Sequence, residues 1–288
     1  MLKKPVELSI IIISYNTKDI LKDCLVSLFA AKTTKDSWEI IVVDNASSDG
    51  SPEMITNEFP DVMLLPQKKN AGFSVGNNLG MRKSKGEYIL LLNSDTQVPS
   101  GSIQETLQYL KHHADIGVVT CKLIRSDGSM DPACHRGFPT PWAALTYFAG
   151  LEKLFPKSKL FGQYHQGYKD LSQPHGIDSP SGAFYMVRRE VVDKVGFLDE
   201  QFFMYGEDLD WSYRIKAAGW KIMFYPAVNV IHKKWQSGKA HPEETQRRLT
   251  QKYFFDAMKL FYKKHYAHRY GWLVTGCVLL GIKLRSLL

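Results

Sequence analysis

At 288 residues the chain is long enough for one large domain or two small ones. Its 44% hydrophobic and 23% charged residues are typical of a globular protein with a core, which excludes a disordered or fibrous chain. The formal net charge of +8 indicates partners that carry phosphate, nucleic acid or an anionic membrane surface. The four cysteines form no CxxC pair and no zinc-like cluster, so reduced thiols of a cytoplasmic protein are expected instead of a disulfide scaffold.

The first half of the chain alternates short apolar runs with stretches of helical periodicity. Helices are predicted over residues 17–31 and 102–112, and a further helix is predicted to begin at Ser51, its N-cap, while residues 71–83 are predicted to be a loop that runs into a helix. Strands are predicted over 8–14, 39–43, 62–65, 88–92 and 117–123. The first apolar run contains Glu7 and precedes no cleavage site, so it is predicted to be a strand and not a signal peptide. Alternating strands and helices predict an α/β fold with a mainly parallel sheet.

The second half is less regular. Residues 125–168 have weak periodicity, which indicates an insertion, a lid or an acceptor loop. Strands are then predicted over 182–188, 222–225 and 228–231, the last two flanking Pro226, and helices over 189–195 and 209–219, with Gly219 as C-cap.

The C-terminal part has a different character. Residues 242–270 are basic, aromatic and helical, and the apolar stretch 271–282 is shorter than the about 20 residues that span a bilayer. We expect an amphipathic anchor on an anionic membrane surface. The alternative is a helix packed on the rest of the protein or on another subunit.

Residues 88–95 (YILLLNSD) end a predicted buried strand in a carboxylate, Asp95. Ligands of open α/β sheets bind outside the carboxyl ends of the strands. Cations such as Mg²⁺ are held there by one or two carboxylates together with phosphate oxygens. Asp95 is therefore a candidate ligand for a divalent cation on a diphosphate.

Polar residues also follow the other strand ends. Tyr15 either stacks on a base or packs as a strand-exit aromatic, and Asp44 either accepts a hydrogen bond from a nucleotide or caps the next helix. Asp49 is predicted to be a helix cap. Gly72 and Gly76 permit close backbone approach before a helix N-terminus that faces an anion, although neither a P-loop nor a GxGxxG fingerprint is present.

Glu207, Asp208 and Asp210 begin a predicted helix among aromatic residues. They either complement the helix dipole or supply a base, because aromatic walls raise the pKa of a carboxylate. His232 follows a strand. A lone histidine is more often structural than a ligand, although Mn²⁺ accepts an imidazole.

Together these segments resemble glycosyltransferase family 2, whose nucleotide-sugar-binding fold is called GT-A. The resemblance covers about residues 6–240 and rests on the order and spacing of the segments 9–16 (SIIIISYN), 40–51 (IIVVDNASSDGS), 70–78 (NAGFSVGNN), 88–95, 179–190 (SPSGAFYMVRRE), 197–200 (FLDE), 206–214 (GEDLDWSYR) and His232. The segment 70–78 and the acidic motif most resemble the non-processive, rhamnosyltransferase-like branch. The processive QxxRW motif is absent, which implies addition of a single sugar.

The resemblance implies roles for individual residues. Asp95 and His232 are implied to bind Mn²⁺ or Mg²⁺, with Asn93 where the first acid of the DxD element usually stands. Asp208 is implied to be the catalytic base, and Glu207 to orient the acceptor or support its loop. The residues implied to bind the nucleotide-sugar are Tyr15, Asn16, Asp44, Asn70, Gly72, Phe73, Gly76, Asn77, Asn93, Ser94 and Trp211.

The implied organisation is a mixed, mainly parallel GT-A domain over residues 1–240, with an acceptor loop or insertion at 125–175, and a C-terminal helical region over 241–288. The implied function is inverting, metal-dependent transfer of one sugar from dTDP-L-rhamnose or a UDP-sugar to a saccharide or polyprenol-linked acceptor, in cell-surface polysaccharide synthesis at the inner face of the cell membrane. The alternatives are a nucleotidyltransferase and a non-catalytic sugar-nucleotide-binding scaffold. No nucleic-acid partner is expected, and the C-terminal helices offer a contact for a homo-oligomer.

Overall fold

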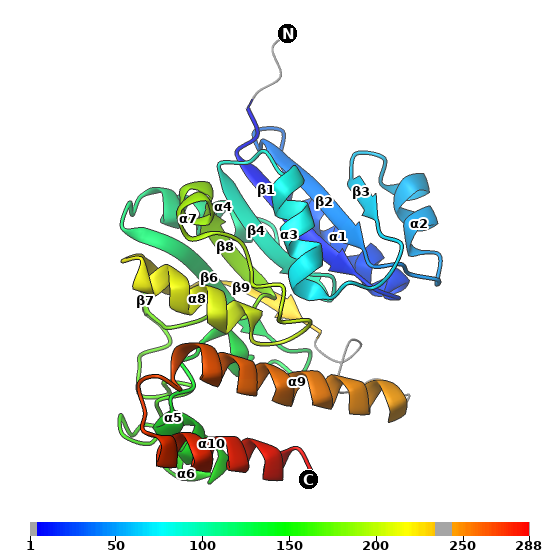
Figure 1. Cartoon of the computed structure of the whole chain (residues 1–288). Helices are drawn as coiled ribbons and strands as arrows, with labels where there is room; N and C mark the ends of the chain where they lie inside the picture. The colour runs from blue at the N-terminus through cyan, green and yellow to red at the C-terminus, as the bar shows by residue number, and fades with distance from the viewer. Residues whose placement is uncertain (1–4, 234–243, 288) are drawn as a thin grey trace.

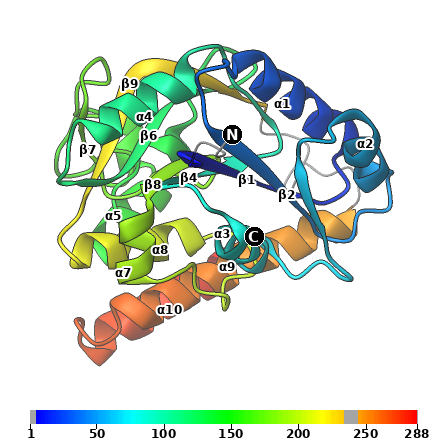
Figure 2. The same cartoon turned by 90° about the horizontal axis from the view of Figure 1, so that it is seen from above.

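The computed structural model describes residues 5–233 and 244–287. Their strands form one nine-stranded sheet: β1 (Leu8–Ser14), β2 (Trp38–Asp44), β3 (Met63–Pro66), β4 (Tyr88–Asn93), β5 (Thr96–Gln97), β6 (Ile116–Ile124), β7 (His175–Gly176), β8 (Phe184–Arg188) and β9 (Lys221–His232). The helices are α1 (Lys18–Ala31), α2 (Ser51–Glu58), α3 (Phe73–Lys83), α4 (Ser102–Lys111), η1 (Pro132–Cys134), α5 (Pro141–Phe148), α6 (Leu151–Leu154), α7 (Arg189–Val195), α8 (Glu207–Ala217), α9 (Glu244–His265) and α10 (Trp272–Arg285). Helices α1 and α4 cover one face of the sheet, and α3, α7 and α8 cover the other (Figure 2).

The order of the strands brings one set of strand ends to a single edge of the sheet. The sheet runs β3-β2-β1-β4-β8-β6-β9-β5, with β7 on β9. Strands β1 to β4 are parallel, β8 is antiparallel to both of its neighbours, and β6 and β9 are parallel. The carboxyl ends of β1, β2, β4, β6 and β9 therefore lie at the same edge as the amino end of β8. The expected mixed α/β sheet is confirmed, and its apolar central strands are buried on both faces.

Three local predictions are wrong. Ser51 is the first residue of α2 and not its N-cap, which is Gly50 at φ +83°, because the Ser51 hydroxyl and N–H both bind Asp49. The C-cap of α8 is Ala218, and Gly219 follows it in the left-handed conformation at φ +91°. The two strands predicted around Pro226 form one strand, β9, whose register against β6 shifts there. Such an irregularity accommodates a proline because it needs no ladder hydrogen bond at that point.

The helix α9 packs across α8. Both helices and the loop before α8 contribute to a second apolar cluster, which consists of Phe202, Leu209, Ala257, Phe261, Tyr262 and Tyr266. Helix α10 lies beside α5 in the lower part of Figure 1, where the guanidinium of Arg285 sits 5.0 Å from the ring centre of Phe148. Among the residues that the structure describes, no helix is both long and apolar enough to cross a membrane.

Candidate active site

Asp95 and His232 meet at the carboxyl edge of the sheet. Strand β5 pairs with the end of β9, with Thr96 opposite His232, and this pairing places the preceding residue, Asp95, beside the imidazole. Asp95 Oδ1 lies 3.2 Å from His232 Nε2, and the Asn93 amide nitrogen lies 3.4 Å from the same Nε2. Asp95 and His232 are both buried. The sheet therefore brings together the two residues that the resemblance implies as metal ligands.

Asp131, which the sequence reasoning missed, holds the other side of this histidine. Its fully buried carboxylate accepts a hydrogen bond from His232 Nδ1 at 2.9 Å. Burial alone would lower the pKa of His232, but the hydrogen bonds to Asp131 and Asp95 outweigh it and raise this pKa to about 9. When the imidazole is neutral, donation from Nδ1 leaves the Nε2 lone pair facing Asp95. In the sequence, an aspartate directly before Pro132 indicates only a cap for the short helix η1. Asp131 does provide this cap, in addition to its contact with His232.

The residues of this corner fit a divalent cation. Among the described residues, Asp95 Oδ1 is buried and has no hydrogen-bond donor other than the His232 ring nitrogen at 3.2 Å, so it has a lone pair to offer. A carboxylate oxygen and an imidazole nitrogen are ligands that Mn²⁺ accepts. Within residues 5–233 and 244–287, no cluster of three or more His, Cys, Asp or Glu side chains is arranged to hold a metal ion. Asp95 and His232 thus fit a cation that takes its other ligands from a bound phosphate.

The ends of β1 and β2 form the predicted nucleotide side. Tyr15 is 42% exposed just beyond β1. Asp44 Oδ2 accepts a hydrogen bond from the Ser47 N–H at 2.9 Å, while Oδ1 is buried without a hydrogen-bond donor. Asn16, at φ +50°, accepts from the Ser48 N–H at 2.8 Å and so ties the two loops together. Asp49, which was predicted to be a helix cap, accepts hydrogen bonds from the N–H of Lys18 at the start of α1 and from the N–H of Ser51 at the start of α2.

The loop before α3 is tied to the loop before α8. Asn70 accepts from the Gly72 N–H at 3.0 Å, and the N–H of Phe73 donates to Phe203 O at 2.7 Å. Gly72 has φ +93°, and a Cβ there would lie 2.5 Å from the same Phe203 oxygen, so no other residue fits. Asn45 adds a hydrogen bond to Gly72 O at 3.2 Å.

Three residues implied to bind the donor are packing residues here. Gly76 lies against Ile13 of β1, and buried Asn77 donates to Phe73 O within α3. Trp211 is fully buried, and its indole N–H donates to Gly196 O at 2.8 Å. A ligand has no access to this indole, so we remove Trp211 from the site.

Asp208 is held by a buried cation. Its Oδ2 accepts from Arg136 Nη2 at 2.6 Å and from the Gly182 N–H at 3.3 Å, and its Oδ1 accepts from the Leu209 N–H at 2.7 Å. Arg136 also donates to Pro180 O at 2.6 Å. Sequence reasoning missed Arg136, because nothing in the sequence distinguishes it from the other 36 Lys and Arg residues of the chain. Segment 131–136 thus contacts both His232, through Asp131, and Asp208, through Arg136.

One carboxylate of the acidic motif was expected to have a raised pKa, and this carboxylate is Glu207. Burial and, secondly, the charge of Asp208 raise the pKa of Glu207 to about 8. Its Oε2 is buried without a hydrogen-bond donor. At neutral pH Glu207 is therefore mainly a neutral acid, which can donate a hydrogen bond.

Replacing Glu207 with glutamine is expected to stabilise the protein more at pH 8 than at pH 5. Between the ordinary pKa of 4.5 and about 8 the unfolded chain loses this proton while the folded chain keeps it, so wild-type stability falls as the pH rises through that interval. Glutamine has no proton to lose in this range, so the stability of the variant does not fall in this way. The advantage of the variant in free energy of unfolding should grow by about 3–4 kcal/mol from pH 5 to pH 8, which is several degrees in melting temperature. An equal difference at both pH values would contradict the raised pKa.

Asp210, the third acid, joins α8 to α9. Its fully buried carboxylate lies 2.7 Å from both Lys264 Nζ and His265 Nε2, and it accepts from Arg214 Nε at 2.9 Å. Burial opposes ionisation, but hydrogen bonds from His265 and Lys264 and the charge of Arg214 prevail and lower the pKa of Asp210 to about 2. This acid is a structural anchor.

Comparison with known proteins finds related transferases. The model of the family described as Glycosyl transferase family 2 matches residues 9–196, which end before α8. N-acetylglucosaminyl-diphospho-decaprenol L-rhamnosyltransferase of Mycobacterium tuberculosis is 29% identical over 82% of this chain and 78% of that protein. Low-salt glycan biosynthesis hexosyltransferase Agl10 of Haloferax volcanii is 27% identical over 78% of this chain and 67% of its own.

Two solved structures share the fold at low identity. The mannosyltransferase PcManGT from Pyrobaculum calidifontis, in complex with GDP-Man and Mn²⁺, has a TM-score of 0.60 and 16% identity over 93% of this chain and 66% of that one. GalNAc-T7 with UDP, GalNAc and Mn²⁺ has a TM-score of 0.59 and 18% identity over 90% of this chain and 50% of that one. The chain thus spans about half to two thirds of these structures and has their GT-A fold. Since the family match covers more than half of its residues, the chain belongs to glycosyltransferase family 2.

Proposed function

We propose that the protein transfers one sugar, with inversion at the anomeric carbon, from a nucleotide-sugar to a hydroxyl of a saccharide or polyprenol-linked acceptor. The observation that carries the proposal is the presence, at one edge of the sheet, of the pair Asp95–His232, which suits a cation on a diphosphate, and of Asp208, a buried carboxylate held by Arg136. The named activities of the two relatives support it. The proposed donor is dTDP-L-rhamnose or a UDP-sugar, and the proposed setting is cell-surface polysaccharide synthesis.

The donor is proposed to lie over the ends of β1, β2 and β4. Asp95 and His232 are the proposed ligands of Mn²⁺ or Mg²⁺, which when bound would neutralise charge on the donor diphosphate. Asp44 Oδ1, which has no hydrogen-bond donor in the structure, is proposed to accept from a base N–H or a ribose hydroxyl. The exposed ring of Tyr15 is proposed to stack on the base.

Asp208 is proposed to accept the proton of the attacking acceptor hydroxyl. Two donors, Arg136 and the Gly182 N–H, occupy its Oδ2, whereas Oδ1 accepts only from the backbone N–H of Leu209 and has more capacity left. The activated hydroxyl attacks the anomeric carbon from the face opposite the leaving nucleoside diphosphate, which inverts that centre. Glu207, as a neutral acid, is proposed to orient the acceptor by donating a hydrogen bond.

The test is thermal unfolding with a panel of sugar nucleotides, in Mn²⁺, in Mg²⁺ and in EDTA. A donor at 100 times its dissociation constant should add about 2.7 kcal/mol, or several degrees in melting temperature. We expect this shift with one donor class, and only when the divalent cation is present. In Asp95→Ala the metal-dependent part of the shift should disappear.

Two results would contradict the proposal. An equal shift in EDTA and in Asp95→Ala would remove Asp95 as a metal ligand. Release of pyrophosphate from a nucleoside triphosphate and a sugar phosphate would instead identify a nucleotidyltransferase. Asp61→Ala, which changes an exposed acid outside the site, is the matched control and should shift like the wild type.

We also propose that α10 places the protein on the inner face of the cell membrane. Its large apolar side chains are exposed, with Trp272 at 81% and Leu273 at 62%, and the exposed Lys283 lies near its end. Apolar side chains next to a cation suit an anionic bilayer surface. Binding to phosphatidylglycerol vesicles should fall at least about tenfold in a Trp272→Ala/Leu273→Ala variant. Unchanged vesicle binding, with loss of a dimer in sedimentation, would assign this face to subunit pairing.

A further inference from the structure

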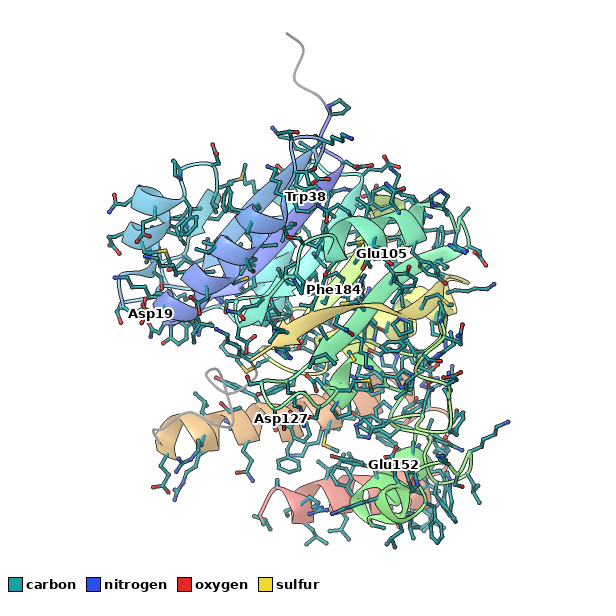
Figure 3. All side chains as sticks on the ribbon, turned by 180° about the vertical axis from the view of Figure 1, so that it is seen from behind. Asp19, Trp38, Glu105, Asp127, Glu152 and Phe184 are labelled. Carbon is teal, nitrogen blue, oxygen red and sulfur yellow. The ribbon has the colours of Figure 1, made fainter. Side chains whose placement is uncertain are left out.

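A cavity of about 610 Å³ separates the α5–α6 segment from the C-terminal helices. Residues of α5, α6, α9 and α10 line it, together with His165. In Figure 3, Glu152 on α6 lies in the lower part of the molecule near α10, away from the sheet residue Phe184. The cavity is therefore outside the donor side formed by β1, β2 and β4, and none of its lining residues is among the proposed donor-binding or catalytic residues.

Two walls of this cavity belong to segments that contact the chain next to the proposed catalytic carboxylates. His165 follows Tyr164, whose carbonyl accepts from the Gly137 N–H at 2.7 Å, next to the Arg136 that holds Asp208. On the other side, Phe254 packs edge-to-face on Tyr205, with ring centres 5.9 Å apart, two residues before Glu207. The cavity thus lies a few contacts away from Asp208 and Glu207, which the acceptor hydroxyl has to reach.

The cavity contains a buried carboxylate oxygen with unused accepting capacity. Glu152 is only 8% exposed, and its Oε1 accepts from the His165 N–H at 2.7 Å. Its Oε2 is buried without a hydrogen-bond donor and lies 3.4 Å from His165 Nδ1. Aromatic side chains line the same cavity, among them Tyr147, Phe148 and Phe255. A carboxylate among aromatic faces suits a sugar ring, whose hydroxyls donate hydrogen bonds and whose C–H face packs on aromatic rings.

Cations and an exposed apolar surface adjoin this aromatic region. Lys153 and Arg285 line the cavity, and within residues 5–233 and 244–287 neither forms an ion pair with an acid. Arg285 uses one N–H for Phe148 O, at 3.1 Å, and keeps other donors for an anion. Next to these cations in sequence, Leu154 is 71% and Leu284 is 56% exposed. Groups that suit a sugar ring, an anion and an apolar chain therefore lie next to one another in this part of the protein.

We propose that this cavity binds the acceptor as a prenyl-diphosphate-linked sugar. The sugar ring lies against the aromatic wall with a hydroxyl on Glu152 Oε2, the diphosphate binds Lys153 and Arg285, and the prenyl chain runs over the exposed leucines. This inference rests on the proposed transferase function and adds to it the acceptor class and its binding residues. It commits to the diphosphate of the acceptor, and not to the headgroups of membrane lipids, as the anion.

The test measures binding of a soluble acceptor analogue, N-acetylglucosaminyl diphosphate with a farnesyl chain, by titration calorimetry without donor and without membrane. Lys153→Ala/Arg285→Ala should raise the Kd of this analogue at least about tenfold, because each substitution removes a charge-assisted hydrogen bond. Lys157→Ala/Lys159→Ala, which removes two exposed cations that do not line the cavity, should stay within about twofold of wild type. Glu152→Gln should weaken binding severalfold while leaving the Kd of the sugar nucleotide unchanged.

Each contrary outcome has a distinct meaning. Wild-type affinity in the Lys153/Arg285 variant would overturn the inference. Loss of binding to phosphatidylglycerol vesicles with unchanged analogue affinity would also overturn it, by assigning the cations to membrane headgroups. A wild-type protein that binds a sugar nucleotide but not the analogue would refute this inference and leave the proposed function standing. Binding of neither ligand would refute both.

Discussion

Asp208→Asn is expected to lower kcat about 10²- to 10⁴-fold while donor binding is retained. An asparagine keeps the size and the hydrogen bond from the Gly182 N–H, but it cannot take a proton from the acceptor hydroxyl. The measurement is the rate of single-sugar transfer at saturating donor and acceptor, together with the thermal shift that the sugar nucleotide produces in the cation's presence. An intact shift with lost turnover would place the defect at the chemical step.

The control for this variant has to account for Arg136, which loses its only ion-pair partner within the described residues. Removal of one partner of a buried pair costs about 3–5 kcal/mol, so the variant must be assayed below its own melting temperature. Asp115→Asn removes an exposed acid that pairs with Lys221 at 2.5 Å, at the opposite end of β6, and should turn over like the wild type. Turnover by Asp208→Asn at the wild-type rate would exclude Asp208 as the base.

Asp210→Asn is expected to lower the free energy of unfolding by about 3–5 kcal/mol and the melting temperature by about 10 °C. The buried carboxylate is held by Arg214, Lys264 and His265, and the neutral amide removes the negative charge that all three contact. Because the pKa of Asp210 is lowered from 3.8 to about 2, its contribution is complete above 3.8 and is lost as the pH falls through about 2. Urea unfolding at neutral pH measures the effect.

The matched control for Asp210 is Asp256→Asn on α9. Asp256 is exposed and lies 3.7 Å from Lys259, a geometry typical of surface pairs that contribute about 0–1 kcal/mol. We expect a change in stability of at most about 0.5 kcal/mol there. An Asp210→Asn variant that is as stable as Asp256→Asn would show that the contact between α8 and α9 does not depend on this carboxylate.

The sequence predicts those parts of the molecule that depend on local pattern. The buried strands β1 and β4 are mainly apolar, and the turn residues that follow them mark the sheet edge where Asp95 lies. Asp131 and Arg136 could not be predicted in the same way, because the roles of both depend on partners far along the chain, His232 and Asp208. Their own neighbourhood has weak periodicity and gives no sign of these contacts.

Trp211 shows the opposite error. Its place in an acidic, aromatic motif implied contact with the donor, whereas an indole one helical position beyond Asp210 faces the core, where it stacks on Tyr185. A motif identifies a segment, and the helical period then divides its residues between the site and the core. Glu207 and Asp208 begin the helix and lie at the edge of the sheet, while Asp210 and Trp211 are fully buried.

The contact of Asp210 with Lys264 and His265 has a consequence for how this chain can be combined with its relatives. The change of sequence character near residue 240 invites an exchange of C-terminal regions between family members. Packing crosses that boundary, because a carboxylate two residues from Asp208 takes two of its three side-chain partners from beyond it. A chimaera that receives a foreign C-terminal region therefore keeps only Arg214 as a side-chain partner for this buried acid, unless Lys264 and His265 are transferred with it.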